Sequence, residues 1–101
     1  MTKLMEKEII PTLMRTRDAG QKEYAHEQEN VFANFERVAQ SIDSTRAKVL
    51  MVYLLKHIDG ISAYAKGHKS QREDVRGRIT DAIVYLWLLW GMVVEENEGE
   101  H

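Results

Sequence analysis

The chain has 101 residues, 44% of them hydrophobic and 30% charged, which fits one globular domain and excludes wholesale disorder or collagen-like repeats. Its 14 Lys and Arg against 16 Asp and Glu give a net charge of −2, which argues against a general nucleic-acid binder. The sequence holds no Cys, so a disulfide, a thiolate zinc site and a cysteine nucleophile are all excluded.

The residue pattern in the first part of the chain predicts one short helix. Pro11 and Gly20 bracket residues 12–19, because Pro suits a first helical turn and Gly suits the position just after a helix. Residues 1–10 are expected to form a helical turn or a frayed arm. Charged residues interrupt them, so they do not have the pattern of a signal peptide. A polar stretch follows over residues 21–30.

The middle of the chain predicts two amphipathic helices. The first covers residues 31–40 after Asn30, and a turn at 41–44 offers Asp43 or Ser44 as the cap of the next helix. That next helix is expected over residues 45–66, ending at Gly67. Its buried stripe is expected to hold Leu50, Met51, Leu54, Ile58, Ile61 and Ala65.

The last predicted helix begins near a capping-box pattern at residues 70–73 and continues to Val94, before an acidic tail at 95–101. It is apolar on almost every side, with one stripe formed by Ile79, Ile83, Leu86, Trp90 and Val93. A four-helix monomer of this size rarely buries a helix on all sides. The prediction is therefore an all-α bundle of about four helices in a single domain, residues 1–101, that forms a homo-oligomer through its C-terminal helix.

The same helix holds the longest apolar run, residues 82–94, which is shorter than the ~20 residues that span a bilayer. We therefore expect a cytoplasmic protein with no membrane contact. The one basic stretch, residues 66–78, carries a net charge of only +3, so DNA binding is also disfavoured.

Three polar groups are candidates for chemistry. Arg78, Asp81 and Tyr85 lie three and four residues apart and so share one face of the last helix. A carboxylate at the mouth of an apolar seam needs a partner, a metal or a proton. Two alternatives stand: an Arg–Asp pair with a Tyr hydrogen bond that fixes helix register, or an anion or metal site.

The second group is Glu23 with Glu27, four residues apart, beside Lys22 and Tyr24. Paired carboxylates can hold Mg²⁺, although the same pattern also occurs on ordinary solvated helix faces.

The third group is Lys56, His57 and Asp59. His57 and Asp59 point about 160° apart on a helix and cannot hold one ion together. His57 flanks the apolar stripe, where a hydrogen-bonded residue at the edge of the core is the simpler interpretation. Gly60, in the same helix, permits a close helix crossing or ligand approach. Phosphate-binding glycine loops and serine nucleophile elbows are missing from the sequence.

Four segments taken together resemble a known class. Lys22-Glu23-Tyr24, Asn30-x-Phe32-x-Asn34-Phe35, Lys56-His57-x-Asp59 and Gly77-Arg78-Ile79-x-Asp81-x-x-x-Tyr85-Leu86 are similar to small all-helical phage and prophage proteins. Those resemble the nucleotide-modification-associated helical domain and, more distantly, the MazG-like nucleotide pyrophosphohydrolases. The resemblance covers residues 22–95.

The resemblance implies a Mg²⁺-dependent, nucleotide-directed protein in the cytoplasm of a phage host. It assigns the metal to Glu23, Glu27, Asp59 and Asp81, the phosphates to Lys22, Lys56 and Arg78, and the base or sugar to Tyr24 and Tyr85, with His57 close by. MazG-like enzymes use Glu-x-x-Glu and Glu-x-x-Asp. In this chain Glu23 and Glu27 are four residues apart instead of three, and Arg78 stands three residues before Asp81, where the family pattern has Glu. Nucleotide binding without hydrolysis is therefore as consistent with the pattern as an enzyme is.

A second hypothesis has no chemistry. A small acidic helical phage protein can act by docking on a host protein complex, in defence or transcription, and inhibiting it. The apolar last helix or the acidic tail would then be the contact surface.

Overall fold

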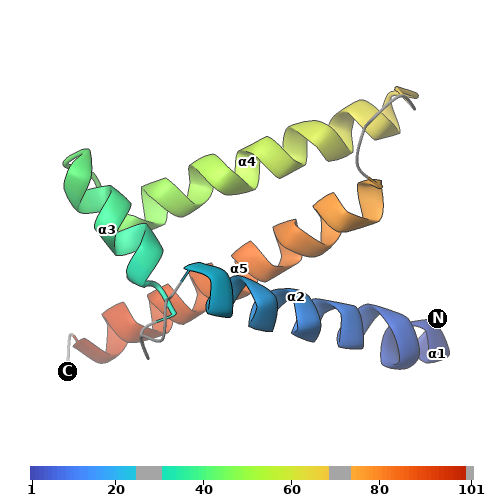
Figure 1. The fold of residues 1–101 in the computed structure, drawn as a ribbon, viewed down its shortest axis with the longest axis horizontal. Coiled ribbons are helices and arrows are strands. Elements are labelled where there is room, and N and C mark those ends of the chain that lie inside the picture. Colours follow the sequence, from blue (N-terminus) through green and yellow to red (C-terminus); the bar gives the residue numbers. More distant parts are fainter. Residues whose placement is uncertain (25–30, 69–73, 100–101) are drawn as a thin grey trace.

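The computed structural model describes residues 1–24, 31–68 and 74–99; for residues 19–24 and for 99 it describes the backbone alone. Four helices pack together, and the described residues contain no strand, which confirms the all-α prediction. Figure 1 shows their order: an N-terminal helix made of α1 (Thr2–Leu4), a π-helical segment (Met5–Ile9) and α2 (Ile10–Tyr24), then α3 (Ala33–Ser41), α4 (Arg46–Ala65) and α5 (Val75–Gly99).

The N-terminal helix passes through Pro11 and Gly20, so the prediction of a short helix over residues 12–19 was wrong. The reason lies in the π-helical segment before Pro11, where Ile10 donates its backbone N–H to the carbonyl of Met5, five residues back. A proline has no N–H and crowds the carbonyl four residues earlier. The wider π turn changes the bonding pattern just before the proline, and the helix continues.

Both ends of α4 are fixed by local hydrogen bonds. The Thr45 hydroxyl accepts from the backbone N–H of Lys48, so Thr45 is the cap in place of Asp43 or Ser44. At the other end Gly67 adopts a φ of 96°, the left-handed conformation that glycine favours. The His68 N–H then reaches the carbonyl of Ala63 at 3.0 Å, which confirms the predicted end at Gly67.

Helix α3 ends in the same way, at Asp43. This residue has a φ of 53°, and the N–H of Ser44 donates to the carbonyl of Ala39 at 2.8 Å. Asp tolerates the left-handed conformation better than most residues do. The turn between α3 and α4 is therefore determined locally.

Helix α5 begins at Val75 after Asp74, whose carboxylate accepts from the backbone N–H of Arg76 at 2.9 Å. The predicted capping box at residues 70–73 lies outside the described residues. The helix continues to Gly99, five residues past the predicted end at Val94, so the acidic tail is helical over most of its length. Glu95 contributes to this order by pairing with Arg46.

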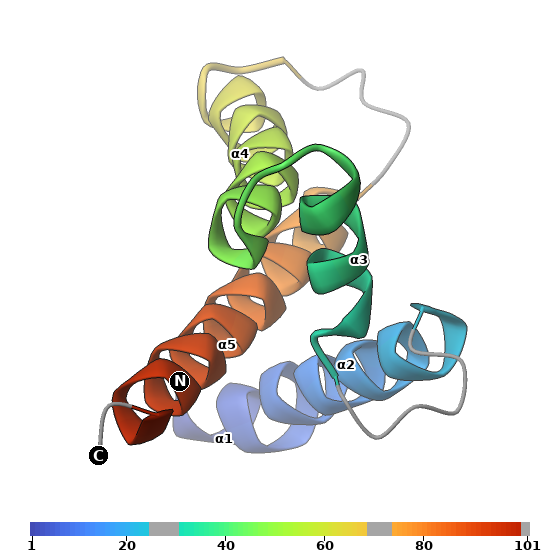
Figure 2. The ribbon, with the colours of Figure 1, turned by 90° about the vertical axis from the view of Figure 1, so that its left-hand side faces the viewer.

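The core lies where α3 meets the antiparallel pair α4 and α5. Its buried residues are Phe32, Phe35, Ala39, Val49, Leu50 and Met92, and Leu50 is fully buried. Helix α3 packs on α4, and α2 packs on α5. Figure 2 shows α2 and α3 on the same side of the α4–α5 pair. In the part of the chain that the structure describes, α3 and α2 are the helices that pack most on this pair.

This arrangement leaves apolar side chains exposed on two adjacent helices. Met51, Ile58 and Ala65 belong to the stripe predicted to be buried, but all three are exposed, so that stripe is narrower and shorter than predicted. We define the α4–α5 apolar face as the exposed side chains that follow helical spacing on α4 and on α5: Met51, Leu55, Ile58, Ile79, Leu86, Trp90 and Val93.

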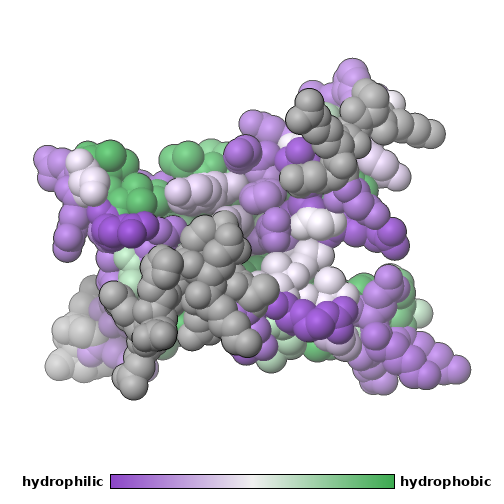
Figure 3. All heavy atoms as spheres, in the orientation of Figure 1, coloured by the Kyte–Doolittle hydropathy of each residue, from purple (hydrophilic) through white to green (hydrophobic). Residues whose placement is uncertain are grey.

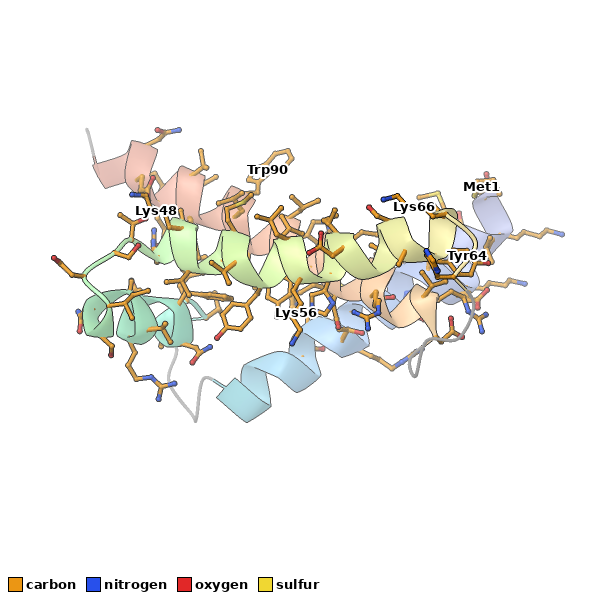
Figure 4. All side chains as sticks on the ribbon, turned by 90° about the horizontal axis from the view of Figure 1, so that it is seen from above. Met1, Lys48, Lys56, Tyr64, Lys66 and Trp90 are labelled. Carbon is orange, nitrogen blue, oxygen red and sulfur yellow. The ribbon has the colours of Figure 1, made fainter. Side chains whose placement is uncertain are left out.

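Trp90 marks this face most clearly, since 74% of the residue is exposed. In Figure 4 it projects from the opposite side of the α4–α5 pair to Lys56; α3 and the C-terminal part of α2 lie on the Lys56 side, and the chain reaches the Trp90 side at its Met1 end. Figure 3 views the molecule from the α2 and α3 side, where hydrophilic side chains predominate over scattered apolar patches.

Among the described residues one helix, over Val75–Glu98, is long and apolar enough to cross a membrane by length and composition alone. The prediction of no membrane contact considered only the unbroken apolar run at residues 82–94. The helix is longer than that run because polar residues extend it at both ends. A core helix of a soluble protein passes the same test.

Candidate functional site

The polar candidates of α5 contact α4 from the middle of the helix pair to the end where α5 begins. Because the two helices are antiparallel, Tyr85, Asp81 and Arg78 lie successively opposite Tyr53, His57 and Gly60. The shared face predicted for the three α5 residues is therefore the face that contacts α4. We call these six residues the interhelical polar cluster.

His57 and Asp81 form the centre of the cluster. His57 Nε2 lies 3.8 Å from Asp81 Oδ2, with side-chain exposures of 17% and 41%. The separation allows an ion pair when the imidazole is protonated and is long for a direct hydrogen bond. The pair therefore joins α4 to α5 close to solvent.

Aromatic rings extend the cluster toward the core. The Tyr85 ring lies 5.6 Å from the His57 ring and stacks on Tyr53 at 6.1 Å with an interplanar angle of 15°. Phe35 of α3 contacts both tyrosines edge to face, at 6.1 and 6.2 Å. Such pairs add about 0.5–1.5 kcal/mol beyond their burial. The rings hold three helices together and fix the position of Tyr85.

Arg78 lies directly against Gly60. A Cβ atom at position 60 would come within 2.5 Å of Arg78 Cδ and 2.7 Å of Nε. The close approach that the mid-helix glycine predicted is thus made by an arginine of α5. Two nitrogens here, Arg78 Nε and His57 Nδ1, are buried without a hydrogen-bond partner. An unsatisfied buried polar atom is costly, so this part of the interface is not at an energetic optimum.

The other predicted site residues are not part of this cluster. Lys56 and Asp59 are exposed on α4. Lys22, Glu23 and Tyr24 belong to α2 by their backbone, and their side chains lie outside the described residues, as does the whole of Glu27.

No group of three or more His, Asp or Glu able to hold a metal ion occurs among the described residues. Of the predicted magnesium ligands, Asp59 and Asp81 are the two whose side chains the structure describes; Asp59 is exposed on α4, and Asp81 lies beside His57. The predicted site as a whole depends on Glu23 and Glu27 and stays a prediction.

A second cluster, which the sequence analysis missed, surrounds Arg46 at the start of α4. Its Nη1 donates to Glu36 Oε2 of α3 at 3.3 Å and to Glu95 Oε1 of α5 at 3.1 Å. Its Nη2 donates to the Met92 carbonyl at 3.4 Å, and the guanidinium lies 5.0 Å from the centre of the Phe32 ring. With 15% of its side chain exposed, Arg46 links three helices. The partners come from 10 and 49 residues away, so no local pattern indicates them.

At the exposed start of α5 the Arg76 side chain hydrogen-bonds the carboxylate of Asp74, with Nη2 to Oδ2 at 2.7 Å. This bond, helped by the backbone N–H of Arg76, lowers the pKa of Asp74 from 3.8 to about 2. The pair strengthens the helix start.

Chemically, the interhelical polar cluster offers one imidazole, one guanidinium, one carboxylate and two phenols. The same set can fix helix register or contact an anionic ligand. Comparison with protein-family models, curated proteins and solved structures found no match to this chain. The resemblance to nucleotide-directed phage proteins therefore stays a prediction.

Proposed function

We propose that this chain is a non-catalytic binding protein that acts by presenting the α4–α5 apolar face to another polypeptide. The observation that carries the proposal is the face itself: seven exposed apolar side chains on two adjacent helices, with Trp90 at 74% exposure. Contiguous apolar surface of this kind on a small protein marks an interaction site. Exposed Trp also suits a binding anchor, since tryptophan is enriched among interface hot spots.

The polar cluster supports the same proposal by what it does for the fold. His57, Asp81 and Tyr85 bridge α4 and α5 and hold the two helices side by side. A flat, two-helix surface needs such a fixed register to present its side chains reproducibly. In the phage setting that the resemblance implies, a host protein complex is one such polypeptide.

A photo-crosslinking amino acid at Leu55 tests the proposal, with the same amino acid at Ile42 as the matched control. Both residues are exposed and apolar, but Ile42 lies in the turn after α3. We expect a polypeptide adduct from position 55 that excess unlabelled chain suppresses, and none from position 42. Equal labelling at both positions, or none at either, would contradict the proposal.

A nucleotide-binding function is the second candidate, favoured by one observation. Arg78 Nε and His57 Nδ1 are buried without partners beside two stacked tyrosine rings, a combination of cationic and aromatic groups that suits a phosphate and a base. Thermal unfolding with ribo- and deoxynucleotides, with and without Mg²⁺, tests it. A ligand at 100 times its Kd adds about 2.7 kcal/mol, a shift of several degrees for this size. The absence of any shift would remove this candidate.

A further inference from the structure

The single chain has more surface than a compact protein of its mass. Its accessible area is 7853 Å², against about 5,900 Å² expected for a monomer of 11.7 kDa. Its radius of gyration is 15.2 Å, against about 13 Å for a compact domain of this length. An excess of about 2,000 Å² on each chain is about 4,000 Å² for two chains, within the range that obligate homodimer interfaces bury. The chain has the dimensions of one half of a larger assembly.

We propose that a second copy of this chain covers the α4–α5 apolar face, with α5 packed antiparallel on α5 of the partner across a twofold axis. The inference rests on the proposed function and names the polypeptide that the face binds. Every copy of the chain carries this excess surface, so the partner that covers it must always be available. A second copy of the chain meets that condition. Isologous twofold dimers are also the commonest oligomers.

The charge distribution along α5 fits an antiparallel pair. The first turns of the helix, residues 75–81, hold Arg76, Arg78 and Asp81, a net charge of +1; no charged residue occurs over 82–94, and the helix ends with Glu95, Glu96 and Glu98. A twofold axis near its midpoint places the basic start of one copy beside the acidic end of the other. The apolar middle then packs against itself without burying a charge. A parallel pair would instead bring like charges together at both ends, which is unfavourable.

Two specific residues define this contact. Arg76 is exposed, hydrogen-bonds Asp74 of its own chain and lies on the flank of the apolar face, as does Glu98 by helical spacing. In an antiparallel pair, side chains on the same flank of the two helices meet. Arg76 of one copy therefore lies level with Glu98 of the other, twice in each dimer. Trp90 then lies within one residue of the level of Ile83 of the other copy, which provides apolar surface for it.

The first experiment measures mass in solution by light scattering at tens of micromolar chain. We expect about twice 11.7 kDa for the wild type. Trp90→Glu is expected to weaken self-association at least a hundredfold, whereas the control Ile42→Glu leaves it unchanged. Circular dichroism checks folding in each case. A wild type that is folded and monomeric, or a Trp90→Glu variant that stays dimeric, would overturn the inference.

The second experiment leaves the apolar face intact, and so remains informative if Trp90→Glu does not fold. Arg76→Glu and Glu98→Arg each place two like-charge contacts in their own dimer. Mixing the two variants creates a heterodimer in which both contacts are attractive. We expect each variant alone to self-associate about tenfold more weakly than the wild type, and the mixture to regain wild-type affinity. A mixture no tighter than the separate variants would overturn the antiparallel arrangement.

The remaining outcomes separate this inference from the proposed function. A monomer that gives a competable crosslink from Leu55 to a different protein refutes the second copy and leaves the binding proposal standing. A monomer that instead partitions onto phosphatidylcholine vesicles through Trp90 refutes both. A wild-type dimer that Trp90→Glu dissociates supports both.

Discussion

The two ends of the α4–α5 pair each hold an arginine between the helices, and the two arginines differ in how well their hydrogen-bond donors are satisfied. Arg46 hydrogen-bonds two carboxylates and a backbone carbonyl, pairs with a third carboxylate, Glu96, at 3.9 Å, and lies over the Phe32 ring. Arg78, at the other end, is pressed against Gly60 with its Nε buried and unsatisfied. Arg46 links three helices, whereas Arg78 lies between two helices at the position where Gly60 leaves room for it.

The difference follows from which helices are available at each end. Helix α3 packs on α4 near Arg46 and brings Glu36 and Phe32 to it. At the Arg78 end Gly60 removes the side chain that would keep the arginine out. Rigidity is therefore expected to be concentrated at the Arg46 end and adaptability at the Arg78 end. Four experiments sharpen or break this comparison.

The largest effect is expected for Arg46→Met, which keeps much of the side chain's length and removes its charge and donors. Losing the links to Glu36 and Glu95 should lower the free energy of unfolding by about 2 kcal/mol. Arg37→Met is the matched control, since Arg37 is exposed and bonds Asn34 within its own helix. Urea unfolding measures both. Equal effects at the two positions would contradict a special role for Arg46.

The next effect concerns Gly60 and Arg78 together. Gly60→Ala gains about 1 kcal/mol of helix propensity but displaces the Arg78 side chain, so alone it should change stability little. In an Arg78→Ala background the obstacle is gone, and the full gain should appear. A double-mutant cycle by urea unfolding measures this coupling. A cycle that closes with no coupling would show that the two residues do not constrain one another.

A smaller effect is expected for Asp81→Asn, because the pair with His57 is 3.8 Å long and the carboxylate is partly exposed. Stability should fall by less than about 1 kcal/mol, and any nucleotide response should be lost if the cluster binds ligand. Should the melting temperature drop sharply while a ligand response persists, Asp81 is purely a structural partner. His57→Gln is the companion variant.

The smallest effect is a pH dependence confined to the start of α5. The folded pKa of Asp74, about 2, lies below the ordinary value of 3.8, so its contribution is fully present above pH 4. That contribution is lost as the pH falls from about 4 toward 2. Asp74→Asn should remove this part of the acid dependence. NMR titration of the Asp74 carboxyl measures the pKa, and a value near 3.8 would contradict the prediction.

The sequence predicted well wherever the determinants are local. Gly67 marks the end of α4 because only its left-handed conformation and nearby carbonyls are needed. Spacing alone placed Arg78, Asp81 and Tyr85 on one face, and the structure adds that this face contacts α4. Local rules erred at Pro11, because the preceding π turn changes the bonding pattern that a proline normally disrupts.

The rest depends on register between distant helices. Nothing near Arg46 indicates Glu95, and nothing near Asp81 indicates His57, since only the antiparallel packing brings them together. The apolar stripe Ile79, Leu86, Trp90 and Val93 was visible in the sequence, but its exposure could be known only once three neighbouring helices were seen to leave it uncovered. Met51 and Ile58 were misassigned to the core for the same reason.

The N-terminal helix has one further consequence for the molecule's dynamics. Among its described side chains Leu13 alone is buried, and its packing partner is α5. So small an anchorage makes this helix a unit that can open while α3, α4 and α5 stay folded. Its amides should exchange with deuterium through openings of low free energy, well below that of Leu50. A protease that meets the native protein should therefore cut first within residues 1–24, and the remaining three helices should outlast it.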